Sequence, residues 1–225
     1  MAHRITRSTR TRADDRKRGR GGSESPRIIR VAGIDPGLER TGYAVIETPQ
    51  HRIADAGIVT STTSKPLSER LHEIAVGIEE VFVEHDIHLL VVEDLFAHYK
   101  HPRTAILMGH ARGVLLLAAA RRHIEVVSVS ATKIKKALTG NGHASKRQMQ
   151  RAVMATLGLD KIPEPADVAD ALAIAAYGIA LCDRDRNQTE EPRASARAAI
   201  RGCGGLGATG GSSASARNSE QRTGG

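Results

Sequence analysis

The sequence of 225 residues contains no tryptophan, few aromatic residues of any kind, and two cysteines, Cys182 and Cys203. The cysteines form neither a Cys-x-x-Cys motif nor a cysteine–histidine pair at zinc spacing, which argues against a disulfide scaffold and a structural zinc site. No apolar run reaches the roughly 18 residues that a membrane span needs. The N-terminal segment also lacks the apolar stretch of a secretory signal. We therefore expect a cytoplasmic protein with no membrane partner.

Positive charge is in excess. The chain has 33 Lys and Arg against 25 Asp and Glu, a formal net charge of +8, which favours a polyanionic partner. Most of the excess lies in a basic N-terminal extension, residues 1–26, and a Gly/Ser/Arg-rich tail, residues 183–225. Neither segment has enough large apolar side chains to offset the entropy of ordering, so we expect both to be disordered. A single folded domain is expected over residues 27–182.

Strand-like and helix-like patterns alternate within residues 27–182. Apolar, β-branched runs predict strands, and apolar residues at helical spacing predict helices. The predicted strands cover about 28–34, 42–46, 53–60, 89–92 and 124–129, and the predicted helices about 67–84, 104–122, 130–138, 145–157 and 165–182. This order predicts an α/β fold, with a mixed five-stranded sheet flanked by helices on both faces.

Acidic residues stand at the ends of two predicted buried strands. Asp35 ends the first strand, directly before a Pro-Gly turn, and Glu93 ends the fourth. The carboxyl ends of adjacent strands form the usual crevice for a site in such sheets. A carboxylate buried there is costly unless it is paired or metal-bound. Two more acids, Asp167 and Asp170, are three residues apart on a predicted helix, so both project from one face.

These four carboxylates together predict a metal site. Converging carboxylates repel one another unless a cation neutralises them. Because the set offers oxygen ligands only, Mg²⁺ is favoured, with Mn²⁺ as a substitute. Two such ions about 4 Å apart would clamp the attacking water and the leaving 3′ oxygen of a phosphodiester. Taken singly, Asp35 also fits a turn residue and Asp167 a helix N-cap.

Several motifs resemble those of one nuclease family. They are Gly33–Gly37 followed by Thr41–Tyr43, then Val92–Phe96, Gly109–Gly113 and Asp167–Ala173. In order and spacing, across residues 28–178, they resemble the RuvC-type crossover junction endodeoxyribonucleases. The resemblance implies an RNase H-like fold and a homodimer that cuts Holliday junctions, which are four-way DNA junctions, with symmetric Mg²⁺-dependent nicks. A branch-migration helicase is the further partner that the family implies.

The resemblance also implies roles for single residues. It assigns the four carboxylates to the metal-binding catalytic set. Phe96 matches a family aromatic that acts on bases near the junction centre, and Lys135 and Lys146 match lysines near the scissile backbone. After Phe96, the segment 97–102 departs from the family pattern, which puts the base preference in doubt rather than the chemistry.

A basic stretch follows in the sequence. No acidic residue occurs between Glu125 and Asp160, and six basic residues surround the loop at 140–143: Lys133, Lys135, Lys136, Lys146, Arg147 and Arg151. We expect this stretch to be a phosphate track, with Arg147 in contact with DNA. Arg112, within the 109–113 motif, is a further expected DNA contact. The alternative for such a stretch is a solvated helix surface.

Three hypotheses about function follow. The favoured one is a structure-selective endonuclease that leaves 5′-phosphate ends and serves DNA recombination and repair. The second is an actin-like ATPase domain, because the segment 34–45 also resembles a phosphate loop, although the folded region is too short for the second half of such a domain. The third is a DNA-binding module without catalysis, which the presence of all four acids disfavours.

Overall fold

The computed structural model describes residues 2–4, 28–95 and 102–202. The strands are β1 (Ala2–Arg4), β2 (Arg30–Asp35), β3 (Arg40–Glu47), β4 (Arg52–Thr60), β5 (Leu89–Glu93) and β6 (Glu125–Val129). The helices are α1 (Leu67–His85), α2 (Pro102–Arg121), α3 (Ala131–Thr139), α4 (Lys146–Leu157) and α5 (Ala166–Gly202). Every element that the sequence predicts is present in the predicted order.

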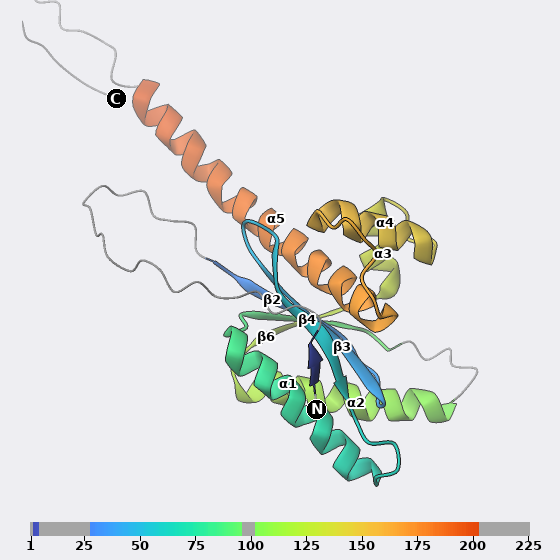
Figure 1. The fold of residues 1–225 in the computed structure, drawn as a ribbon. Helices are drawn as coiled ribbons and strands as arrows, with labels where there is room; N and C mark the ends of the chain where they lie inside the picture. Colours follow the sequence, from blue (N-terminus) through green and yellow to red (C-terminus); the bar gives the residue numbers. More distant parts are fainter. Residues whose placement is uncertain (1, 5–27, 96–101, 203–225) are drawn as a thin grey trace, which may run out of the picture. The chain divides into compact units, whose positions relative to one another are not determined.

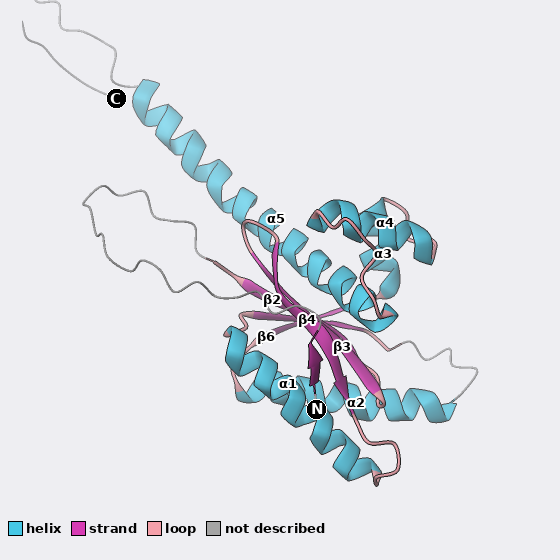
Figure 2. Cartoon of the chain, in the orientation of Figure 1, coloured by secondary structure: helices cyan, strands magenta, loops and turns pink. Residues whose placement is uncertain are grey.

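One mixed sheet lies at the centre of the fold, with strand order β1-β4-β3-β2-β5-β6 (Figure 2). Neighbouring strands β2, β3 and β4 are antiparallel, whereas β2 pairs with β5, and β5 with β6, in parallel. The parallel pairs require crossovers, which α1 and α2 provide. The predicted α/β architecture, a mixed sheet with helices on both faces, is confirmed.

The sheet has a sixth strand beyond the five predicted. Strand β1 pairs antiparallel with β4, with Ala2 opposite Val59 and Arg4 opposite Gly57. Residues 2–4 belong to the extension that we expected to be disordered. Their sequence carries no strand pattern, so the pairing follows from the open edge that β4 presents rather than from local preference. The remaining predictions for residues 1 and 5–27 lie outside the described residues.

Helix α5 also differs from the prediction, because it continues past residue 182 to Gly202. The added segment contains several alanines and arginines, which are strong helix formers, so it can extend a helix without a core of its own. By compactness the chain divides into two units, residues 1–185 and 186–225, and the end of α5 belongs to the second. Residues 203–225 lie outside the described part.

Two apolar cores fix the layers of the first unit. Helices α1 and α2 cover one face of the sheet, and α3, α4 and the beginning of α5 cover the other (Figure 1). Side chains alternate between these cores along each strand. In β2, Val31 packs beneath α5, whereas Ala32 and Ile34 pack against α1 and α2. No helix among the described residues is long and apolar enough to cross a membrane.

Candidate active site

The ends of two neighbouring strands position Asp35 and Glu93. Strand β2 ends at Asp35, and its parallel neighbour β5 ends at Glu93. Val31 in β2 and Val91 in β5 lie in the core beneath α5. Because side chains two and four residues apart share a face of a strand, Asp35 and Glu93 lie on that same side. Both carboxylates therefore stand at one end of the sheet, under α5, as the sequence predicts.

The first turns of α5 lie directly over these strand ends. A Cβ atom at Gly33 would lie 2.2 Å from the backbone nitrogen of Ala175, and one at Gly42 would lie 2.1 Å from the backbone oxygen of Asp167. No side chain can fit at either glycine without moving the helix. The two glycines thus allow the close approach that brings the carboxylates of Asp167 and Asp170 to the site.

The carboxylates influence one another strongly. Burial, followed by the negative charges of Asp170, Glu93 and Asp167, raises the pKa of Asp35 to about 7. Burial and then the Asp170 charge raise the pKa of Glu93, and burial with the Asp167 charge raises that of Asp170. Such shifts mark a site in which negative charges are forced together without enough compensation.

Two cations partly compensate the acids of α5. The Nε atom of Arg40, at the start of β3, donates to Oδ2 of Asp167 at 2.9 Å. The Nζ atom of Lys146, at the start of α4, lies 3.8 Å from Oδ2 of Asp170. Lys146 also opposes the raised pKa values of Asp35 and Asp170, and Lys135 opposes that of Glu93. Each cation comes from a different element, so the site depends on the complete fold.

A cavity of about 230 Å³ adjoins the acids. Glu93 and Asp170 line it together with Lys135 and Lys146, and its remaining lining is largely apolar side chains from α3, α4 and α5. The predicted lysines thus lie beside the predicted carboxylates. Acidic and basic groups that line one opening suit a phosphodiester, because the acids can hold a cation near the reacting phosphorus and the lysines can bind its oxygens.

The donor set fits a hard divalent cation. The acids contribute only oxygens, the ligand type that Mg²⁺ and Mn²⁺ prefer. Burial and the neighbouring negative charges raise the pKa values of Asp35 and Glu93, and a bound divalent ion would supply the positive charge that favours their ionised forms. Within the described residues, however, no three acidic, histidine or cysteine side chains are already arranged around one ion position. To share one ion, these side chains would have to move closer together.

Two other predicted DNA contacts need separate comment. Arg112 donates to the backbone oxygen of Glu93 at 3.2 Å, to Oδ1 of Asp94 at 3.2 Å and to Oγ of Ser128 at 2.6 Å. Its guanidinium therefore supports the end of β5, next to the site, and a contact with DNA stays a prediction. Phe96 lies outside the described residues.

Arg147 lies at a second opening. Together with Arg151 and Lys161 it lines a cavity of about 770 Å³ beside α4, which excludes the four candidate carboxylates but includes Asp160 and Glu164. The basic stretch therefore divides into lysines next to the acids and arginines farther along α4. The predicted phosphate track fits this division, with Lys135 and Lys146 near the reacting phosphate and Arg147 farther along a DNA arm.

Arg40 is the site residue that the sequence analysis missed. It stands between Glu39 and Thr41 at the start of β3, where the sequence has no charge pattern, and 127 residues separate it from its partner Asp167. Only the antiparallel return of β3 beside β2 brings it to the beginning of α5. No local signal could have found this ion pair.

Comparison with known proteins gives one consistent family. The family model described as crossover junction endodeoxyribonuclease RuvC matches residues 31–177. A curated protein of that name from Rhodopirellula baltica is 52% identical over 160 residues, which cover 70% of this chain and 90% of the relative. Another, from Corynebacterium jeikeium, is 38% identical over 146 residues, covering 64% and 89%. These matches disfavour the ATPase hypothesis.

Solved structures agree with this. A structure of Thermus thermophilus RuvC in complex with a Holliday junction substrate matches with a TM-score of 0.62 and 31% identity, covering 67% of this chain and 95% of that one. A structure of Thermus thermophilus RuvC matches with a TM-score of 0.60 and 32% identity, covering 66% and 92%. The predicted RNase H-like fold is thereby confirmed.

Proposed function

This chain belongs to the RuvC family of crossover junction endodeoxyribonucleases, and on that premise we propose that it resolves Holliday junctions by paired, metal-dependent nicks. The chain covers nine-tenths of the Rhodopirellula relative and nearly all of the junction-bound Thermus chain, so the likeness extends over a whole nuclease domain. The product ends would carry 5′ phosphates. The biological setting is DNA recombination and repair.

One observation carries the proposal: four carboxylates from β2, β5 and α5 converge beside two lysines from α3 and α4. Burial, together with the neighbouring negative charges, raises the pKa of Asp35 to about 7, which supports a site that binds a cation. A DNA-binding module without catalysis would have no use for this costly arrangement, because uncompensated carboxylates destabilise the fold and repel a phosphate backbone.

We propose Mg²⁺ as the cofactor, with two ions in each site and Mn²⁺ as a substitute. Asp35, Glu93, Asp167 and Asp170 would hold the ions. When bound, these ions would supply an activated water and would stabilise negative charge on the leaving oxygen.

The protein residues then have separate roles. Lys146 and Lys135, on the rim of the cavity, would bind the nonbridging oxygens of the scissile phosphate. A water would attack phosphorus in line, the bond from phosphorus to O3′ would break, and O3′ would leave with a proton as a hydroxyl. The Gly33 and Gly42 contacts keep α5, and with it Asp167 and Asp170, at a fixed height over the strand ends.

We further propose that the chain acts in the cytoplasm as a homodimer, because one site can cut only one strand and a four-way junction needs two symmetric nicks. A branch-migration helicase complex is the expected functional partner. Phe96 would act on bases near the junction centre.

The test is cleavage of a synthetic four-way junction and of a duplex with the same arm sequence, each with and without Mg²⁺. We expect paired nicks in the junction only, with Mg²⁺ or Mn²⁺, and 5′-phosphate ends that a ligase can seal. Asp35→Asn should bind the junction without cutting it. Equal cutting of duplex and junction would show a general nuclease, and full cutting by Asp35→Asn would exclude the proposed site.

A further inference from the structure

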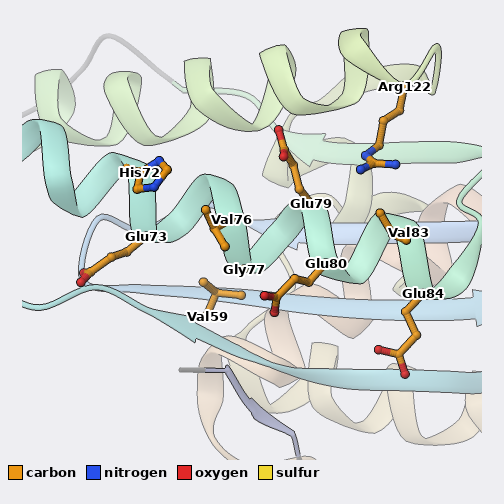
Figure 3. Close-up of a pocket in the computed structure, with 10 residues that line it drawn as sticks. All are labelled: Val59, His72, Glu73, Val76, Gly77, Glu79, Glu80, Val83, Glu84 and Arg122. Atoms are coloured by element: carbon orange, nitrogen blue, oxygen red, sulfur yellow. The ribbon is translucent and has the colours of Figure 1, made fainter.

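A groove of about 1170 Å³ runs along α1, on the face of the sheet opposite the candidate active site (Figure 3). It has no part in the chemistry proposed above. Its lining residues are Val59, His72, Glu73, Val76, Gly77, Glu79, Glu80, Val83, Glu84 and Arg122.

The floor of the groove is formed where α1 lies close to β4. A Cβ atom at Gly77 would lie only 2.6 Å from Cγ1 of Val59, so the missing side chain lets the helix approach the strand and leaves space beside it. Val76 and Val83 are 42% and 60% exposed. The groove therefore offers apolar surface to a ligand as well as charge.

The charge of the groove is negative. The side chains of Glu73, Glu80 and Glu84 project from the side of α1 that faces the sheet edge (Figure 3). Arg122 is the one Lys or Arg among the lining residues. Glu73 is already engaged by Lys65, at 2.6 Å. Glu80 makes no ion pair with any described residue. On a chain with a net charge of +8, this surface would repel DNA and attract a basic segment.

The beginning of the chain already lies at this edge. Strand β1 pairs with β4 and runs from the level of Val59 towards that of Gly57. Helix α1 runs in the same direction, from Gly77, which lies against Val59, towards its end at His85. Strand β1 thus points along the groove towards Glu84. The chain that follows, residues 5–20, contains seven Lys and Arg residues and two Asp.

We propose that the α1 groove is the docking site for the chain's own basic N-terminal segment, residues 5–20, with β1 as its anchor. Backbone pairing of β1 with β4 supplies the register, and the glutamates of α1 supply the opposite charge. The short connection from β1 gives the segment a high effective concentration at the groove, so weak ion pairs are sufficient. Docking neutralises arginines that would otherwise be free to bind DNA nonspecifically.

Limited trypsin digestion of the full-length protein tests this, because the segment is rich in arginine. Cleavage after Arg7 to Arg20 is followed by mass spectrometry in the wild type and in the double variant Glu80→Gln, Glu84→Gln, which adds no trypsin site. We expect cleavage about five-fold faster in the variant, since proteolysis follows the population of the undocked segment. Salt at about 0.5 M should accelerate cleavage of the wild type towards the rate of the variant.

The matched control is Glu69→Gln, Glu125→Gln, which removes two exposed acids outside the groove. It should be cut at the wild-type rate, and circular dichroism should show that all three proteins are folded. Equal rates in the wild type and the Glu80, Glu84 variant, without a salt effect, would overturn the proposal. Protection that rises with protein concentration would also overturn it, because the occupant would then be the segment of a second copy.

Discussion

Arg40 and Asp167 form an ion pair of 2.9 Å that joins the start of β3 to the first turn of α5. The guanidinium engages an oxygen of one of the four carboxylates proposed to bind metal. An arginine and a divalent ion would therefore compete for the same carboxylate. The Arg40 pair holds Asp167 in place without metal and would oppose binding of a metal there.

Replacing Arg40 with alanine should raise the affinity of the DNA-free protein for Mn²⁺. Both side chains are partly exposed, so the pair is weak, and we expect a decrease in Kd of about three-fold. Calorimetric titration with Mn²⁺ measures this directly, and Arg40→Lys, which keeps the charge, serves as the control. An unchanged or weaker affinity in Arg40→Ala would show that the pair does not compete with the ion.

Replacing Asp35 with asparagine should stabilise the metal-free protein while it removes cleavage. The pKa of Asp35 in the folded protein, about 7, lies above the ordinary aspartate pKa of 3.8 that the unfolded chain has, so ionisation favours the unfolded chain as pH rises between these values. We expect a gain on the order of 2 kcal/mol at pH 8, or a rise of about 4–8 °C in Tm.

The pH dependence separates this cause from a general effect of the substitution. The stabilisation by Asp35→Asn should be clearly smaller at pH 5 than at pH 8, as measured by thermal unfolding with a chelator. Asp160→Asn, at an exposed carboxylate outside the cluster, should have no comparable effect. A gain that is equal at pH 5 and pH 8 would exclude the raised pKa as its source.

Metal binding should release a proton below pH 7. A carboxyl with a pKa of about 7 holds a proton for most of the time at pH 6, and an ion must displace it. Calorimetry in buffers with different ionisation enthalpies should show roughly one proton released per site at pH 6 and almost none at pH 8.5. Proton release that does not depend on pH would show that the proton comes from a group other than Asp35.

Lys146→Ala should weaken binding of all junction sequences to a similar degree. We expect the slope of log K against log salt concentration to decrease by about one, because one phosphate contact is lost. Binding is measured without metal, so that no substrate is cut. Lys65→Ala, which removes a lysine paired with Glu73 on the other face of the sheet, should leave the slope unchanged.

Gly33→Ala should destabilise the protein by about 2–3 kcal/mol, because the new methyl group would meet the backbone of α5. Cleavage should fall with it, since α5 carries two of the acids. Gly109→Ala in α2 meets only ordinary contact with Leu95 and should stabilise the helix by about 0.5–1 kcal/mol. Denaturant unfolding of both variants compares the two effects.

The acidic site could be predicted from sequence because its signals are local. A strand that ends in an acid before Pro-Gly places Asp35, and a spacing of three residues places Asp167 and Asp170 on one helix face. The raised pKa of Asp35 and its partner charges depend on distances between strands and helix that no single segment contains. Arg40 was missed for the same reason.

The fold shows the same division. Long periodic segments such as α1 and the buried strands could be predicted almost to the residue. Strand β1 could not, since three residues without a strand pattern are ordered only by the edge they pair with. The extension of α5 past residue 182 was missed because low apolar content was taken as disorder, although alanine and arginine favour helix.

The pairing of β1 with β4 also bears on solubility. A sheet with a bare edge offers unpaired backbone donors and acceptors to any other strand, and native proteins protect such edges against aggregation. Here the protection at β4 comes from Ala2–Arg4, and a deletion or fusion at these residues would alter it. Loss of those residues would leave the nuclease chemistry intact and expose a template for strand-to-strand association between copies.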